Sequence, residues 1–497
     1  MMELVQNFPF FAIMMYLAGG VTCCVLRPKA SKTVCLCLNV LVTAMMLAAL
    51  GFTVRNGSYV FKMGHFPAPW GNEIRIGPLE ALMASVFAGV MTLTLLGGMK
   101  HIFEDCEEEK TSLYFTVVNL LMASMISLIF TNDIFTGYVF VEINTIASCA
   151  LVMLRYRSGR ALAATTRYLI MSLLGSGLFL LGIIILYGVT GHLLMEPMAE
   201  KITALAQSGD YSFPLTVTAG LFAVGLALKS ALWPFHSWLP DAHSSATASS
   251  SGILSGLVLK SYIILLIKIF YRVLTPGVVL SKHITDLIFC FGVGAMIFGS
   301  LYALKEKDIK RLLAYSSVAQ VGYIFTGIGL GSRAGMTAAC LQIIAHAFTK
   351  PMLFCTAGGF MDVSGGSRKF SALKGAGRRD PLSGIAFAVG ALSMIGIPLF
   401  AGFPVKLELT NAALSAEPWK LWIVAGAIVI STILNALYYI PAVAMLFSKN
   451  GEAPCKAAKP DALYIVAISA FIALNLFLGT GSGEFVSIIS DGLALFG

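Results

Sequence analysis

Long apolar runs recur along the whole of this 497-residue chain. Each run has about 18 residues or more, enough for a helix to cross roughly 30 Å of hydrocarbon. Hydrophobic residues make up 57% of the sequence, charged residues 12%, and the mean hydropathy is +0.84. This composition excludes an ordinary soluble domain and predicts an all-α polytopic membrane protein. We expect about fourteen transmembrane helices, at residues 8–26, 33–54, 79–99, 112–131, 133–154, 164–189, 213–233, 246–271, 284–304, 310–331, 336–360, 382–412, 420–447 and 461–480.

Lysine and arginine are distributed unevenly over the loops and helix ends between these runs. Assigned alternately along the chain, 21 of them fall on one side of the membrane and 9 on the other. Because inner loops carry the excess of positive charge, we expect both termini outside and residues 367–380 inside. The predicted location is the inner (plasma) membrane. The net charge of +9 follows from this topology, so nucleic acid is not an expected partner.

The remaining four of the 34 basic residues are lysines inside predicted spans: Lys229, Lys260, Lys350 and Lys406. An ionisable group at the centre of a bilayer costs about 2.5–3.5 kcal/mol on insertion scales. We therefore predict that these lysines have a functional task in the membrane. For Lys260 the alternative is snorkelling toward the headgroups, because Lys268 and Arg272 follow closely in the sequence.

Acidic counterparts inside the spans are few. Glu142 is the one acid well inside the spans of the first half, and it shares a helical face with Thr145 and Cys149. The alternative role for Glu142 is a structural bond to a neighbouring backbone. Glu408 lies two residues from Lys406 and faces roughly the opposite side of its helix, so we predict a lateral contact for it.

Two predicted helices carry a stripe of residues on one face, for which a role in function is expected and a structural role of the histidine is the alternative. Gln342, His346 and Lys350 are spaced four residues apart, which stacks them on one face, and Pro351 then removes a helix hydrogen bond. The other stripe consists of Gly252, Gly256 and Lys260, small residues that let a helix or water approach the lysine.

Two predicted spans are interrupted by proline beside a lysine. Lys229 comes five residues before Pro234, while Lys406 follows Pro398 and Pro404. Unwound backbone at membrane depth is tolerated where protein or a water-filled cavity satisfies it. Such a pair, one in each half, favours internal repeats with a site near the middle of the membrane.

Cofactor and metal chemistry receive no support from the sequence. The ten cysteines form no CxxC pair, and there is neither a Walker motif nor a strand-linked GxGxxG. We expect no cofactor, no metal site and no catalytic residues. Whether the chain belongs to an enzyme complex is left open.

Four segments in order resemble one known family: KSALWPFHSWLPDAH, KDIKRLLAYSSVAQVGY, AHAFTKPMLFCTAG and GIPLFAGFPVK. They are similar to the antiporter-like subunits of respiratory complex I, Mrp cation/proton antiporters and membrane-bound hydrogenases, most of all to the D-type Mrp subunit. The resemblance covers about residues 80–445. It implies two inverted five-helix repeats, residues 112–271 (helices 4–8) and 284–447 (helices 9–13), with helices 7 and 12 broken. Residues 1–111 would hold helices 1–3, and residues 448–497 helix 14 and a tail.

The resemblance also implies which residues translocate protons. The family's positions in helices 5, 7, 8, 11 and 12 correspond here to Glu142, Lys229, Lys260, His346, Lys350 and Lys406. Secondary candidates are His236, His243, Gln342 and Glu408. We expect Glu142 and Lys229 to form an ion pair that opens and closes during each cycle, since a pair about 4 Å apart is worth roughly 4 kcal/mol before desolvation.

One segment departs from the family pattern. Relatives carry a proline that opens helix 8, whereas residues 244–256 read SSATASSSGILSG, with no proline. This puts the entry geometry near Lys260 in doubt.

The function predicted from these observations is transport. We predict a proton-translocating subunit, with cation/proton exchange as an open variant, that works with other membrane subunits of an Mrp, hydrogenase or related complex. The alternative is an antiporter-like subunit of a quinone-reducing NADH dehydrogenase. A redox enzyme in its own right would need cofactor ligands, and an inert scaffold leaves four intramembrane lysines unexplained.

Overall fold

The computed structural model describes residues 2–66, 71–155, 159–208, 211–274, 282–449 and 461–495. Among these residues, thirteen helices are long and apolar enough to cross a membrane, which confirms the all-α polytopic fold class. Twelve of them are α2 (Phe8–Val25), α3 (Pro28–Asn56), α4 (Pro78–Asp105), α5 (Glu108–Phe130), α6 (Ile134–Met153), α7 (Gly159–Thr190), α9 (Ser212–Lys229), α13 (Lys282–Lys305), α14 (Ile309–Gly329), α15 (Arg333–Asp362), α19 (Pro418–Leu446) and α20 (Ala462–Thr480).

The thirteenth span is the predicted eighth helix, which is continuous over Ala248–Val273 and buried except at Tyr271, which is partly exposed. It consists of α11 (Ala248–Ile253), the π-helical turn η3 (Leu254–Val258), α12 (Leu259–Lys268) and a second π-helical turn, η4 (Ile269–Val273). We call this span helix 8. In place of the missing proline, Thr247 caps its start by accepting a hydrogen bond from the Ser250 amide.

The predicted break in the twelfth helix is confirmed, because residues 382–412 do not form one helix. The chain folds instead as α17 (Pro381–Ile395) and α18 (Gly402–Leu414). Between them the backbone turns through Gly396 and Leu399, both with positive φ, and Pro398 lies in this turn. Glycine adopts this conformation without strain, so Gly396 ends α17 where the chain must change direction.

The seventh helix also breaks where the sequence predicts, although four residues before the end of the predicted span. α9 ends at Lys229, and a short 3₁₀ helix, η2 (Phe235–Trp238), and α10 (Leu239–Ser245) follow. The break leaves carbonyls at the end of α9 without helical partners. The indole of Trp238 donates to one of them, Leu228 O, at 3.3 Å.

Several short elements were not predicted, because none has the length or composition of a membrane span. They are α1 (Met2–Gln6), β1 (Tyr59–Lys62), the 3₁₀ turn η1 (Met63–His65), β2 (Glu73–Ile76), α8 (Met195–Ser208), α16 (Ala376–Arg379) and α21 (Ser482–Ala494). β1 and β2 form an antiparallel hairpin in which Tyr59 pairs with Ile76 and Lys62 with Glu73.

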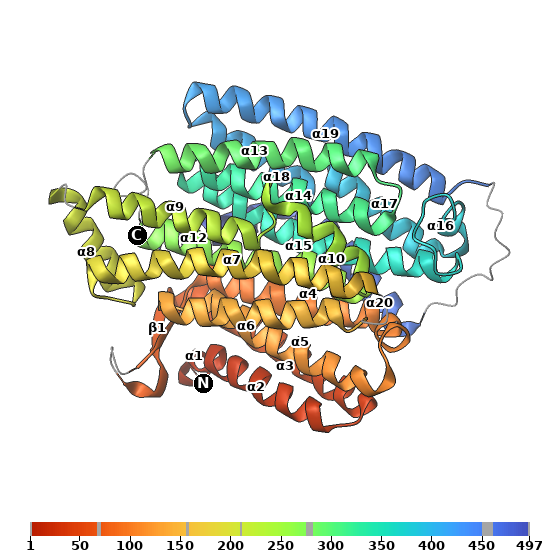
Figure 1. The fold of residues 1–497 in the computed structure, drawn as a ribbon, viewed down its shortest axis with the longest axis horizontal. Coiled ribbons are helices and arrows are strands. Elements are labelled where there is room, and N and C mark those ends of the chain that lie inside the picture. The colour runs from red at the N-terminus through yellow and green to blue at the C-terminus, as the bar shows by residue number, and fades with distance from the viewer. Residues whose placement is uncertain are drawn as a thin grey trace.

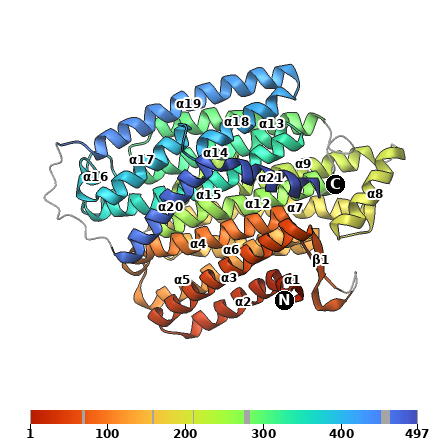
Figure 2. The ribbon, with the colours of Figure 1, turned by 180° about the vertical axis from the view of Figure 1, so that it is seen from behind.

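The long helices lie roughly side by side, with α2 and α19 at opposite edges and α15 and helix 8 in the interior (Figures 1 and 2). One end of the bundle carries α1, α8, β1 and the last turns of α21, and the other end carries α16. We call these the α8 end and the α16 end. The two chain termini therefore lie toward the same end.

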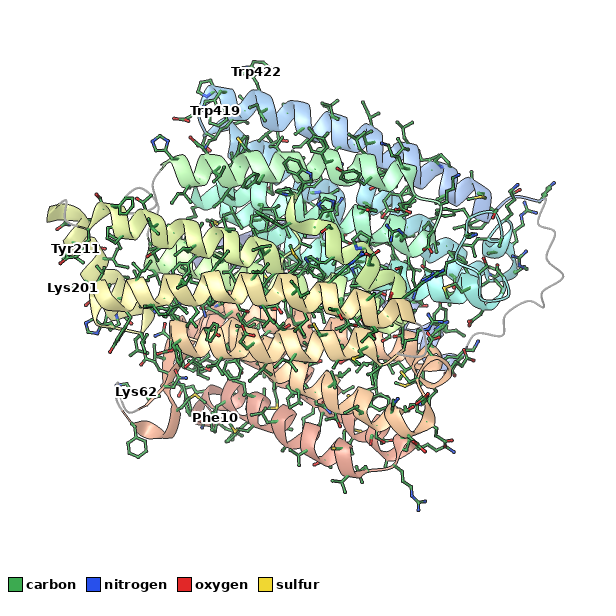
Figure 3. All side chains as sticks on the ribbon, in the orientation of Figure 1. Phe10, Lys62, Lys201, Tyr211, Trp419 and Trp422 are labelled. Atoms are coloured by element: carbon green, nitrogen blue, oxygen red, sulfur yellow. The ribbon has the colours of Figure 1, made fainter. Side chains whose placement is uncertain are left out.

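The predicted sides of the membrane correspond to these two ends. Lys62 and Lys201, predicted to be outside, lie at the α8 end together with Tyr211, Trp419 and Trp422 (Figure 3). α16, with Arg378 and Arg379, belongs to the loop that is predicted to be inside. Three basic residues of the inner count, Arg157, Lys456 and Lys459, lie outside the described residues.

Candidate functional site

The end of α9 places Lys229 inside the bundle, with no exposed surface. Its ammonium group donates a 2.7 Å hydrogen bond to the Thr145 hydroxyl on α6 and lies 5.4 Å from the centre of the Tyr262 ring. The Tyr262 hydroxyl in turn donates to Asn144 Oδ1 at 3.1 Å. Lys229 is therefore held by a hydroxyl and an aromatic face, both of which tolerate a charged or a neutral amine.

Glu142 lies one turn before Thr145 on the same face of α6, as its spacing predicts, and is partly exposed. It acts on Lys229 electrostatically. The described residues include no ion pair between Glu142 and Lys229, and the buried Glu142 Oε1 has no hydrogen-bond partner there. The expected ion pair is thus absent from this conformation, in which Thr145 takes the place of the acid.

Lys260 lies in the interior of helix 8, directly after the first π-helical turn. Its ammonium group donates to the carbonyl of Ser255, and the Ser255 hydroxyl lies 2.8 Å from that of Ser317 on α14. Lys260 has no exposed surface, so snorkelling to a headgroup is not how this conformation accommodates it. The π-helical turn supplies the carbonyl, because a widened turn changes the pairing of the backbone.

The glycine stripe of helix 8 brings it against the proline kink of α15. A side chain on Gly256 would place its Cβ 2.5 Å from Pro351 Cγ, and one on Gly252 would lie 3.2 Å from Pro351 Cα. These contacts confirm the predicted close approach of a helix to the stripe. Lys260 and Lys350 therefore lie on neighbouring interior helices.

The polar stripe of α15 is buried along its whole length. Lys350 donates to Leu313 O at 2.9 Å and to the Tyr439 hydroxyl at 3.4 Å. Gln342 donates to Gln320 Oε1 at 2.7 Å. Between them, both ring nitrogens of His346 are buried without a hydrogen-bond partner among the described residues.

The two secondary histidines have different surroundings. His243, on α10, is fully buried, stacks on Phe354 at 4.8 Å and also has both nitrogens unpartnered in the described part of the chain. Phe354 lies one turn after Lys350 on α15, so the His243 ring packs beside the segment that carries Lys350. His236 instead stacks on Tyr302 at 5.4 Å and belongs to a separate aromatic group. The structure therefore joins His243, and not His236, to the central lysines.

Lys406 lies one turn into α18 and is partly exposed. It donates to Ile395 O, at the broken end of α17, and at 2.6 Å to the Thr432 hydroxyl on α19. The Tyr323 ring centre is 5.6 Å away. Glu408, also partly exposed, forms no ion pair with Lys406 within the described ranges.

Sequence analysis missed further buried basic residues, because it counted them with the loops. Lys310 has no exposed surface and donates to Ala246 O at 2.9 Å, three residues after His243. Lys268 is 1% exposed and donates to Ile129 O and Thr131 O, at 2.7 and 2.6 Å, near the end of α5. Both lie near helix ends, where hydropathy cannot distinguish a buried lysine from one in a loop.

The site contains several side chains whose chemistry allows them to be protonated or deprotonated. Lys229, Lys260, Lys350 and Lys406 come from four spans and bond to hydroxyls and carbonyls instead of carboxylates. An amine held this way can be charged or neutral without breaking an ion pair. His243 and His346 lie near these lysines, and their ring nitrogens have no hydrogen-bond partner in the part of the chain that the structure describes.

Comparisons with known proteins agree with these motifs. The family described as NADH:quinone oxidoreductase/Mrp antiporter, transmembrane, matches residues 131–433. NADH-quinone oxidoreductase subunit N of Desulforudis audaxviator is 33% identical over 411 residues, which cover 82% of this chain and 79% of that protein. The D-type subunit of the Na(+)/H(+) antiporter of Alkalihalophilus pseudofirmus is 29% identical over 405 residues, covering 80% of this chain and 78% of that protein.

A solved structure has the same fold over its full length. A chain of the membrane-bound sulfane sulfur reductase, an archaeal respiratory membrane complex, superposes with a TM-score of 0.87 at 25% identity, covering 100% of this chain and 97% of that chain. The four motifs, the broken helices and these similarities lead to one conclusion: the chain belongs to the NADH:quinone oxidoreductase/Mrp antiporter family of transmembrane subunits.

Proposed function

We propose that this chain is a proton-translocating membrane subunit of an Mrp-type or related energy-converting complex. The observation that carries the proposal is a set of basic side chains inside the bundle: Lys229, Lys260, His346 and Lys350 have no exposed surface, and Lys406 is partly exposed. Placing four amines inside the bundle, three of them fully buried, has a high free-energy cost. Neutral residues would meet structural needs at these positions at a lower cost. A row of groups that change charge is what a proton path through a membrane requires.

Protons enter this path from the α16 end. A cavity of about 1080 Å³ opens there, and its lining includes both basic and acidic side chains, among them Arg167, Arg311 and Asp241. It reaches Ser244 and Ser245, which directly follow the buried His243. From His243 the next groups are Lys260 and Lys350, and Lys406 provides the exit toward the outside or a neighbouring subunit.

The pair of Glu142 and Lys229 switches this path. When Glu142 approaches, it holds Lys229 charged; when it retreats, Lys229 donates to Thr145 and is free to pass its proton toward Lys260. Moving one charge through 100 mV involves about 2.3 kcal/mol, similar in size to the energy of such a pair. The break after Lys229 lets the segment shift without unwinding α9.

Both termini, and therefore the α8 end, face outward, as the excess of basic residues on the other side supports. Cysteine-accessibility labelling of residues 367–380 tests this orientation: labelling from the inside agrees with it, and labelling from the outside reverses it.

The alternative parent is a quinone-reducing NADH dehydrogenase, which is favoured by the similarity to subunit N of Desulforudis audaxviator. Purification of the chain with its native partners distinguishes the two. Small antiporter subunits support the first proposal, and quinone-site subunits support the alternative.

The function itself is tested by Lys350→Met in the native complex. We expect proton transport by membrane vesicles to be lost while assembly is normal. Lys305→Met, which removes an exposed lysine from the α16 side of α13, is the control and retains transport. Full transport in Lys350→Met at normal expression would show that Lys350 is only structural. The same assay with and without sodium tests cation exchange.

A further inference from the structure

Hydroxyl groups lead from Lys350 toward Lys406 along the interior face of α19. From the Lys350 side, the Tyr439 hydroxyl lies 3.4 Å from the ammonium group and 2.9 Å from the Ser316 hydroxyl. Tyr438, the residue before Tyr439 on α19, lies with its ring centre 4.6 Å from that of Tyr439. These side chains are all buried. Since a hydroxyl both donates and accepts, such a series can pass a proton along.

A second series begins at Lys406. Its ammonium group donates to Thr432, and the adjacent residue, Ser431, lies 3.4 Å from the Ser300 hydroxyl on α13. The Tyr323 ring lies beside the Lys406 ammonium group, and its hydroxyl has no hydrogen-bond partner among the described residues. The two series approach each other at one residue, Asn435.

Asn435 is fully buried between them. Tyr438 donates to its Oδ1 at 2.7 Å, and Ser300 donates to the same oxygen at 3.1 Å. Its Nδ2 donates to Met394 O, at 3.1 Å, near the broken end of α17. Because Met394 O can only accept, this bond determines which end of the amide faces the hydroxyls.

This arrangement interrupts the path. The amide oxygen accepts from both sides and has no proton to give. The single hydrogen of Ser300 is shared between Asn435 Oδ1 and Met296 O, at 2.7 Å, and both are acceptors. In the described part of the chain, Tyr438 and Ser300 each direct a hydrogen to Asn435 Oδ1. In this conformation a proton on Tyr438 therefore meets the amide oxygen and is not passed on to the Ser300 hydroxyl.

We propose that Asn435 insulates the Lys350 side of the path from the Lys406 side. In the absence of a driving force, the amide prevents protons from leaking along the hydroxyls between the two lysines. During driven transport, the neighbouring side chains or water must provide a route around the amide. This inference rests on the proposed function and adds a gating residue to it. The bond to Met394 O also links the insulator to the broken end of α17, which lies beside Lys406.

The test is the passive decay of an imposed pH gradient in vesicles that hold the native complex, without an energy source. Asn435→Asp keeps the size of the side chain, but its neutral carboxyl group both donates and accepts, so we expect decay at least severalfold faster than in the wild type. Asn435→Leu provides no hydrogen bonds, and decay should stay at the wild-type rate.

The matched control is Asn39→Asp. Asn39 on α3 is also fully buried, accepts from a tyrosine (Tyr16, 3.1 Å) and donates to a backbone carbonyl (Cys35, 2.8 Å), but it lies outside both predicted repeats. This variant should decay like the wild type. If Asn435→Asp does not assemble, Asn435→Ser offers a neutral hydroxyl at the same place and should also leak.

Wild-type decay in the assembled Asn435→Asp complex, or in Asn435→Ser where Asp does not assemble, would overturn the proposal. Equal leakage in Asn435→Asp and Asn435→Leu would also overturn it, because the cause would then be defective packing. The proposed function is tested by a different measurement: if the wild-type complex shows no driven proton transport, the proposed function is wrong, whatever the passive decay rates are.

Discussion

Lys229 in the first half and Lys406 in the second half have the same surroundings, built from different helices. Lys229 is the last residue before the break in helix 7, and Lys406 follows the break in helix 12. Each ammonium group donates to a threonine hydroxyl and lies over a tyrosine ring, 5.4 Å from the ring centre for Lys229 and 5.6 Å for Lys406. For Lys229 the threonine comes from α6 and the tyrosine from helix 8. For Lys406 the threonine comes from α19 and the tyrosine from α14.

If the predicted repeats are matched in order, α6 corresponds to α14 and helix 8 to α19. The two partners have therefore exchanged helices between the halves. Both lysines thus have a threonine hydroxyl and a tyrosine ring as neighbours, but these side chains come from helices that do not correspond in the two repeats. The sites also differ in two ways: Lys229 is fully buried with Glu142 nearby, whereas Lys406 is partly exposed and has no acid paired to it in the described ranges.

The largest effect on proton transport is expected from changes to Lys229 and to Glu142, the acid near it. Lys229→Met and Glu142→Gln should each lower driven proton transport by about 1000-fold, within the range of a positioned proton-transfer group. If the two act as one switch, the double variant is no worse than either single variant. Losses that multiply in transport assays on the assembled complex would mean that the residues act independently.

A smaller effect is expected at the second site. Lys406→Ala should lower transport by about 100-fold, because the partly exposed site lets water replace some of the lost function. Lys406→Arg keeps the charge and should be better tolerated. Equal losses in both variants, measured at equal expression, would show that the shape of the side chain matters and the charge does not.

The exchanged threonines provide the third comparison. Thr145→Val and Thr432→Val each leave an ammonium group with one hydrogen bond fewer, and we expect about tenfold slower transport in each, equivalent to roughly 1.4 kcal/mol. Thr145→Val should have the larger effect of the two, since Lys406 retains Ile395 O as an acceptor. A neutral result at both positions would remove the threonines from the mechanism.

The smallest effect concerns the tyrosines and is measured as stability. Tyr262→Phe removes a hydroxyl that bonds to Asn144 and should lower the free energy of unfolding by about 1 kcal/mol. Tyr323→Phe removes a hydroxyl without a partner in the described residues and should be nearly neutral. Both variants keep the ring beside the lysine. Denaturation of the purified complex compares them, and a larger loss in Tyr323→Phe would contradict the assignment.

Much of the fold was predictable because membrane spans depend on local composition. Each predicted run corresponds to a helix, to helix 8 or, for 382–412, to the pair α17 and α18. The breaks were predictable because proline removes a helix hydrogen bond wherever it occurs. The hairpin of β1 and β2 was not, since its eight paired residues are stabilised by contacts with the surrounding helices as much as by their own propensity.

The sequence by itself determined that the chain crosses the membrane many times, that helices 7 and 12 are broken, and that four lysines fall within the apolar runs. These properties depend on hydropathy, charge and proline, which act over a few neighbouring residues. The tertiary structure alone decided what each lysine touches: Thr145 is 84 residues from Lys229, and Ala246 is 64 residues from Lys310. It also buried Lys310 and placed Asn435 between two series of hydroxyls. The physical reason is that a buried polar group must find its partner among whatever helices pack against it, and packing brings together residues that no local pattern relates.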